Sequence, residues 1–295
     1  MISEELKNDL KIKWDRMRDG MAKMGMDACL LTVDVNLYYT TGQIYSGYFY
    51  LPVDGEPWFL IKRPNGLSGH QVEYIRKPED IPTLFAERGI KMPKRLLLEA
   101  DELTYNEYIR LQHVFRAEAT GNASALIRHI RMIKTPWEIE PMRISARRHE
   151  AGDREIPACY RPGMRDVELQ IEIEKRMRMH GSLGYFRAFG SNMDIFMGSL
   201  LAGENAGEPS PFDFALGGKG IHASGPLGAN GTLLREGTTV MADMSGNYTA
   251  YKTDMTRVFS IGKLPDRAYR VHRVALEIQA SKGRTAKTGV ACAES

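Results

Sequence analysis

The sequence has few of the features that mark membrane, secreted or disulfide-rich proteins. It holds three cysteines in 295 residues, Cys29, Cys159 and Cys292, and no Cys-x-x-Cys pair. This argues against a disulfide framework and a thiolate metal site and favours a reducing compartment. No stretch approaches 18 consecutive apolar residues, and the charged residues 1–9 do not resemble a signal peptide. We therefore expect a cytoplasmic protein.

The sequence also lacks a strong excess of one charge. Its 40 basic and 37 acidic residues leave a formal net charge of +3, which indicates neither nucleic acid nor an anionic membrane as a partner. A basic stretch over residues 128–148 carries only one interleaved aromatic residue, Trp137, so a solvated helical face is favoured over a nucleic-acid site. We expect no nucleic acid and no membrane among the partners.

The first part of the chain alternates between helical and strand-like patterns. Leu6, Leu10 and Trp14 recur at helical spacing, and the spacing predicts a helix over residues 5–24. Thr104, with Glu107 three residues on, predicts a capped helix to residue 115. A further helix is expected over 81–88, strands over 28–33, 58–61 and 95–99, and a turn-bounded segment over 37–42. This alternation predicts a small α/β domain with helices over a central sheet.

The character of the chain changes between residues 121 and 137, and we assign a first domain to residues 1–127 and a second to residues 128–295. In the second, residues 137–159 read as helical. Asp166 is expected to cap a helix whose Leu169, Ile173 and Met177 share one face. Strand-like runs follow at 238–242 and 256–259, and helical spacing resumes over 266–281.

Two carboxylates, Asp243 and Asp254, stand at the ends of a predicted hairpin. A turn centred on residues 248 and 249 would place them opposite each other, whereas a turn at Gly246-Asn247 would pair Asp243 with Ala250, and a bulge would reconcile the two. Paired carboxylates can bridge two hard or borderline cations. On spacing alone, solvated acidic residues at a loop mouth are the more common explanation.

The order of several motifs resembles the pita-bread metallopeptidases of family M24. Asp243-x-x-Gly246, Tyr251 and Asp254-x-Thr256-Arg257 match the metal-binding hairpin of that family. Segments similar to its Xaa-Pro aminopeptidase, prolidase and creatinase branch lie at 24–31, 36–42, 130–139, 160–169 and 234–240. The resemblance implies an α/β N-terminal creatinase-like domain followed by a partial α+β pita-bread catalytic domain.

The resemblance also implies roles for individual residues. Asp243 matches the first metal ligand and Asp254 the carboxylate that bridges two divalent ions, Mn, Co or Zn. Thr256 and Arg257 match flanking positions that support the ligands. His222 lies about where the family places a catalytic histidine that contacts substrate, although its surroundings match poorly and an exposed loop histidine is the alternative.

Three further metal ligands that the family implies are not found. The family takes one histidine and two glutamates from later motifs, and only 295 − 257 = 38 residues follow Arg257. Within them His272, Glu277 and Glu294 match no family motif. We therefore expect a chain truncated before its C-terminal ligands, with an incomplete ligand set, and inactive by itself.

Three functions follow from these patterns. The first is an Xaa-Pro aminopeptidase or dipeptidase that hydrolyses the peptide bond before proline in short proline-containing peptides, with a water activated by two metal ions. The second is a creatinase-like hydrolase of a non-peptide C–N bond, which keeping both Asp243 and Asp254 disfavours. The third is a non-catalytic interaction or dimerisation module, and a homodimer is the protein partner expected.

Overall fold

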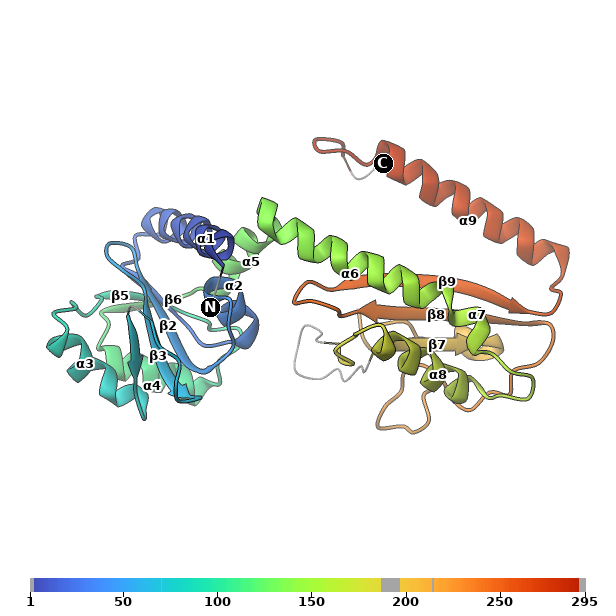
Figure 1. Ribbon diagram of the computed structural model, residues 1–295, viewed down its shortest axis with the longest axis horizontal. Coiled ribbons are helices and arrows are strands. Elements are labelled where there is room, and N and C mark those ends of the chain that lie inside the picture. The colour runs from blue at the N-terminus through green and yellow to red at the C-terminus, as the bar shows by residue number, and fades with distance from the viewer. Residues whose placement is uncertain (1–2, 70, 187–196, 214, 292–295) are drawn as a thin grey trace. The chain divides into compact units, whose positions relative to one another are not determined.

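The computed structural model describes residues 3–69, 71–186, 197–213 and 215–291 (Figure 1). Contacts within the chain define two compact units, Met1–Trp137 and Glu138–Ser295. The boundary proposed between residues 127 and 128 stays a prediction. In the described part of the chain, no helix combines the length and the apolar character that crossing a membrane requires.

The first unit is built on a six-stranded mixed sheet with the order β4-β3-β2-β1-β5-β6. β1 pairs parallel with β5, and β5 with β6, whereas β2 runs antiparallel to both β1 and β3. The sheet confirms the three strands predicted for this unit and adds three. The strands are β1 (Ala28–Leu31), β2 (Ser46–Pro52), β3 (Trp58–Arg63), β4 (Val72–Tyr74), β5 (Arg95–Leu98) and β6 (Ala119–Asn122).

Helices cover both faces of this sheet (Figure 1). Because successive side chains of a strand point to opposite faces, Cys29 and Leu31 of β1 enter one core and Ala28 and Leu30 the other. The first core receives side chains from α1 (Glu4–Lys23), α2 (Asp34–Thr41) and α5 (Ser124–Met132), and the second from α3 (Ile81–Glu87) and α4 (Tyr105–Phe115). The 3-10 turn η1 (Pro78–Asp80) precedes α3.

Helix α4 begins as predicted, and α2 corrects the prediction of a turn-bounded segment over residues 37–42. Thr104 Oγ1 accepts from the Glu107 amide at 3.3 Å, and the Thr104 amide donates to Glu107 Oε2 at 3.1 Å. At the start of α2, Val33 supplies no side-chain cap. The amides of Thr32 and Val33 instead donate to Glu99 Oε2 at 2.6 and 2.9 Å. A carboxylate 66 residues away in sequence therefore caps this helix.

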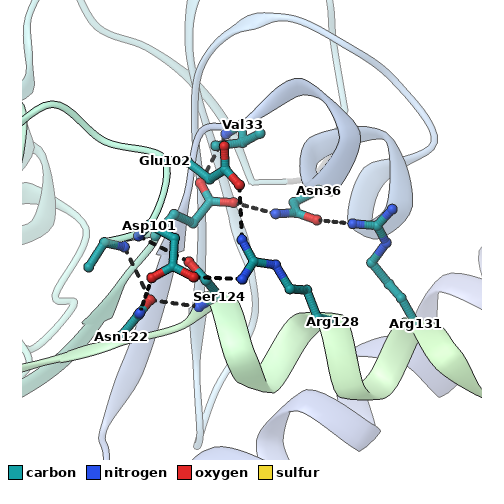
Figure 2. Close-up of polar contacts among 10 residues, drawn as sticks. Val33, Asn36, Asp101, Glu102, Asn122, Ser124, Arg128 and Arg131 are labelled. Carbon is teal, nitrogen blue, oxygen red and sulfur yellow. Dashed lines mark hydrogen bonds and ion pairs between the residues drawn. The ribbon is translucent and has the colours of Figure 1, made fainter. Parts of the chain in front are cut away.

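Two arginines dock α5 onto the same region, as Figure 2 shows. Arg131 donates to Asn36 Oδ1 at 3.0 Å, and Asn36 donates in turn to Glu99 Oε1 at 2.7 Å. Arg128 contacts Asp101 at 2.6 Å and Glu102 at 3.1 Å. These two members of the basic stretch thus have roles within the fold.

The second unit holds the three-stranded antiparallel sheet β7-β8-β9 (Figure 1). Val240, Ala242 and Met244 of β8 form its core with side chains of α8, including Leu169, Ile173 and Met177. Those three residues lie on one helix face, as predicted. The elements are α6 (Pro136–Arg154), α7 (Ile156–Cys159), α8 (Asp166–Met179), β7 (Gly198–Ala202), η2 (Gly203–Gly207), β8 (Thr238–Gly246), β9 (Thr253–Ile261) and α9 (Asp266–Thr285).

The expected capping role of Asp166 is wrong. Asp166 is the first residue of α8, and Arg165 occupies the cap position. The buried Asp166 carboxylate accepts instead from the amides of Asn230 at 3.0 Å and Gly231 at 2.9 Å. It therefore fixes the loop that leads to β8, which carries the first of the two predicted metal ligands.

Candidate metal centre

The register of the β8–β9 hairpin differs from both sequence alternatives. Asp243 pairs with Thr256, and Asp254 pairs with Ser245, so the hairpin is centred between Thr249 and Ala250. Relative to direct opposition of the two aspartates, the register is shifted by two residues. Because the side-chain period of a strand is two, this shift leaves both carboxylates on the same face, as diagonal neighbours.

The two aspartate side chains meet on that face. Burial raises the pKa of the Asp254 carboxyl, and Asp243 raises it further through its charge and a hydrogen bond between the two side chains. Thr256 Oγ1 donates to Asp243 Oδ1 from the opposite strand. The face lies away from the core, since Ala242 and Met244, on either side of Asp243, point into it. The predicted ligands therefore converge on a partly exposed face.

This pair is suited to holding a divalent cation. Two carboxylates within hydrogen-bond distance repel when both are charged, and either a shared proton or a cation relieves that repulsion. Their oxygens are ligands that Mn²⁺ and Zn²⁺ accept. Among the described residues, however, no group of three or more histidine, cysteine, aspartate or glutamate side chains is placed to hold a metal ion. The described pair thus fits part of a metal site.

The other face of the hairpin carries a polar cluster that the sequence analysis missed. His149 of α6 is fully buried, and its Nδ1 lies 2.9 Å from Thr253 Oγ1. Its Nε2 lies 3.5 Å from Asp153 Oδ1. The Tyr248 hydroxyl, His149 Nε2 and both Asp153 oxygens are buried and have no hydrogen-bond partner among the described residues. Buried polar groups of this kind are rare and call for an explanation.

Burial also displaces the pKa values of this cluster. It lowers the pKa of His149 to about 4, and the Arg257 charge lowers it further. It raises the pKa of Asp153 to about 6, against the opposing Arg257 charge. It raises the pKa of Tyr248 to about 12, and the Asp153 charge adds to that increase. At neutral pH the cluster therefore holds a neutral imidazole beside an ionised carboxylate.

A sequence signal for this cluster exists in α6. The buried positions of that helix are Glu138, Ser145, His149, Gly152 and Asp153, none of them a large apolar residue. A buried helix face normally shows an apolar stripe. In α6, regularly spaced small and polar residues take the place of that stripe. Such a pattern indicates a helix that packs against its neighbours through hydrogen bonds.

The remaining predicted site residues lie apart from the carboxylate pair. Arg257 pairs with Ala242 and so belongs to the core-side face, where its guanidinium donates to the Thr256 carbonyl at 2.9 Å. His222 is exposed in a tight turn, with Nδ1 2.9 Å from Ser224 Oγ. No contact recorded for the described residues joins His222 to Asp243 or Asp254. The roles proposed for His222, Thr256 and Arg257 stay predictions.

The first unit contains a cavity of about 890 Å³ between the β2–β3 hairpin and α4. Acidic and basic side chains face it, among them Asp34, Glu107, Lys62, Arg63 and Arg110. Lys62 already contacts Tyr48, and Arg110 contacts Glu79. The mixed charge and these contacts do not select a ligand class.

Two protein families match the chain, one over each part. Residues 13–133 match the creatinase/prolidase N-terminal domain, and residues 140–295 match metallopeptidase family M24. The second match covers more than half of the 295 residues.

Curated relatives and solved structures agree with these matches. An uncharacterized peptidase of Bacillus subtilis is 23% identical over 91% of this chain and 70% of its own length. An uncharacterized peptidase of Staphylococcus aureus is 24% identical over 94% of this chain and 74% of its own length. The matches do not support the expectation that the chain is truncated.

Solved structures show the same fold at low identity. An Xaa-Pro dipeptidase from Bacillus anthracis matches with a TM-score of 0.70 at 22% identity. The match covers 92% of this chain and 70% of the dipeptidase. An X-Pro aminopeptidase from Thermotoga maritima has a TM-score of 0.72 at 20% identity, with coverages of 73% and 92%.

Proposed function

Because the chain belongs to metallopeptidase family M24, we propose that it is a metal-dependent Xaa-Pro peptidase, hydrolysing the peptide bond before proline in short peptides. The family and the fold class predicted from the sequence are confirmed, with a creatinase-like N-terminal domain followed by an M24 domain. A peptidase is therefore established at the level of the family. The preference for proline and the dependence on metal are the proposal.

The observation that supports metal dependence most directly is the carboxyl pair. Asp243 and Asp254 come from different strands, lie on one face and share a hydrogen bond. When bound, a pair of divalent ions lowers the pKa of a water molecule and so supplies a nucleophile near neutral pH. Asp243 and Asp254 would contribute carboxylate oxygens to hold these ions.

The chain's own residues prepare this pair for cation binding. Thr256 donates to Asp243 Oδ1 and so limits the rotation of that carboxylate. Asp243 raises the pKa of the Asp254 carboxyl, and protons compete with a cation for these oxygens, so metal affinity should fall as pH falls. Each carboxylate would act as a ligand and not as the attacking group.

The preference for proline is supported by similar structures. The protein from Bacillus anthracis is described as an Xaa-Pro dipeptidase and that from Thermotoga maritima as an X-Pro aminopeptidase. Both share the fold of this chain over more than nine-tenths of its length. A creatinase-like C–N hydrolase that works without metal remains the second candidate, and the paired aspartates argue against it. The third candidate function is a non-catalytic interaction or dimerisation module, in which two copies of the chain pair.

Metal titration of the full chain tests the proposal. Metal-free protein is titrated with Mn²⁺ in a calorimeter, alongside Asp243→Asn and Asp254→Asn. Asp266→Asn, at the exposed start of α9, is the matched control. Both hairpin variants should lose binding at least about tenfold, because each removes a charged ligand, while the control should bind like the parent. Equal affinity in all four proteins, or no binding by the parent, would contradict the assignment.

Hydrolysis separates the three candidate functions. With Mn²⁺ added, cleavage of Ala-Pro faster than Ala-Ala, abolished by a chelator, would support the peptidase and would contradict the expectation that this chain is inactive by itself. Turnover that survives the chelator would favour the creatinase-like alternative. A stable dimer with no turnover on either dipeptide would favour the dimerisation module.

A further inference from the structure

Helix α6 contacts the β8–β9 hairpin through hydrogen bonds along one face. Tyr251 donates to Glu138 Oε1 at 2.9 Å, and Thr249 donates to the Pro141 carbonyl at 3.2 Å. One turn further on, Ser145 Oγ lies 2.9 Å from Thr249 Oγ1. Positions 138, 141, 145 and 149 follow the three- and four-residue spacing of a single helix face. The contact is therefore directional, and each bond fixes one point of the hairpin.

The hydrogen bond between His149 and Thr253 lies next to the proposed metal-ligand pair. Thr253, whose hydroxyl meets His149 Nδ1, is the first residue of β9, and Asp254 follows it directly. The partner of Thr253 across the hairpin is Gly246. A methyl group on Gly246 would overlap both Thr253 Oγ1 and His149 Nδ1. The absence of a side chain at position 246 thus leaves room for this hydrogen bond.

Asp153 sets the direction of the bond. Its Oδ1 lies 3.5 Å from His149 Nε2, four residues earlier on the same helix. The neutral imidazole carries one proton, and a carboxylate on the Nε2 side favours that proton on Nε2. With that tautomer Nδ1 is the acceptor, and the Thr253 hydroxyl, which also lies 3.4 Å from the Gly246 carbonyl oxygen, donates to it at 2.9 Å. The His149–Thr253 hydrogen bond therefore joins α6 to the start of β9, and the Asp153 carboxylate, 3.5 Å from Nε2, acts on His149 through its charge.

We propose that His149 is a positioning residue for the metal centre: through Thr253 it fixes the start of β9 and so aims the Asp254 carboxylate at Asp243. This inference rests on the proposed role of Asp254 as a metal ligand. A separate metal site at His149 and Asp153 is disfavoured, because the Arg257 guanidinium acts on both groups and the described residues supply no third ligand.

Matched pairs of variants test the positioning role by Mn²⁺ affinity. Thr253→Val removes the hydroxyl and keeps the shape, whereas Thr253→Ser keeps the hydroxyl. Thr253→Val should weaken Mn²⁺ binding by about tenfold, because loss of a group that orients a ligand typically costs 10–100-fold in affinity. Thr253→Ser should bind within about threefold of the parent. His149→Leu and His149→Asn form a second pair, in which asparagine keeps a polar atom near the place of Nδ1.

A control separates positioning from general stability. Ser145→Ala removes another bond of the same helix face, at the hairpin loop rather than at the ligands. It should lower the melting temperature without changing Mn²⁺ affinity. If His149→Leu does not fold, the Thr253 pair decides. Parent-like affinity of Thr253→Val while Asp254→Asn loses binding would overturn the positioning role alone. Unchanged affinity of Asp254→Asn would overturn the proposed function itself.

Discussion

Two buried carboxylates, one taken from each unit, differ in how many hydrogen bonds they accept. Glu99 in the first unit is fully buried and accepts three hydrogen bonds, from the Thr32 and Val33 amides and the Asn36 side chain. Asp153 in the second unit is 5% exposed and accepts no hydrogen bond from any described residue. Burial raises the pKa of both carboxyls. A carboxylate with all these hydrogen bonds stabilises the fold, whereas a buried carboxylate with none, beside the hairpin that carries the proposed metal ligands, is a candidate for a functional role.

Removing the paired carboxylate should have the largest effect. Glu99→Ala leaves two partly buried backbone amides and the buried Asn36 side chain without their acceptor, each at about 1–3 kcal/mol, so we expect a loss on the order of 3–5 kcal/mol. Glu99→Gln retains one acceptor oxygen and should lose less. Urea unfolding with hydrogen exchange at α2 measures this. A loss under about 1 kcal/mol in Glu99→Ala would show that the carboxylate does not hold this helix.

The Asp153 carboxyl should make the stability of the protein depend on pH. The pKa of Asp153 rises from 3.8 to about 6 on folding, so its contribution is full below 3.8 and is lost as pH rises through 6. The pKa of His149 falls from 6.5 to about 4, so its contribution is full above 6.5 and is lost as pH falls through 4. The two dependences oppose each other in the parent protein.

A variant that removes one of the two groups should show the pH dependence of the other. We expect the free energy of unfolding to change by about 2–3 kcal/mol, since one pKa unit corresponds to about 1.4 kcal/mol. In Asp153→Asn, stability should fall as pH is lowered from about 6.5 to 4. In His149→Asn, it should fall as pH is raised from about 4 to 6. Unfolding measured by exchange of the β8 and β9 amides checks both slopes. Identical pH profiles in the parent and both variants would contradict the assigned charge states.

The smallest effect should come from a paired polar group in the second unit. Ser145→Ala removes one hydrogen bond to Thr249, which keeps its bond to the Pro141 carbonyl. We expect a loss of about 1 kcal/mol by chemical denaturation, the usual net value of such a bond. A loss comparable with that of Glu99→Ala would mean that the α6 face is as integral to its unit as the Glu99 network is to the first.

Much of the fold could be predicted because it follows from local patterns. The spacing of Leu169, Ile173 and Met177 predicts the buried face of α8, and Thr104 with Glu107 predicts the start of α4. Helix α2 could not be predicted, because its cap is Glu99 and its own residues offer none. Local sequence does not record a cap supplied from another part of the fold.

The site shows the same division. The identity of Asp243 and Asp254 as candidate ligands follows from the hairpin motif, and the register does not. Turn residues suggest a turn at Gly246-Asn247, whereas the structure centres the hairpin at Thr249 and Ala250. Thr249 there bonds to Pro141 and Ser145 of α6. A contact with a distant helix thus accompanies a register that turn chemistry alone does not predict.

The two-residue periodicity of the hairpin determines which insertions and deletions would keep Asp243 and Asp254 on the same face of the sheet. Deleting one residue between Asp243 and Gly246 would turn Asp243 toward the side of the sheet that faces α8 and separate it from Asp254. Deleting two would return it to its original side. The carboxyl pair is therefore sensitive to whether the number of residues gained or lost is odd or even, and it can be destroyed without replacing either aspartate.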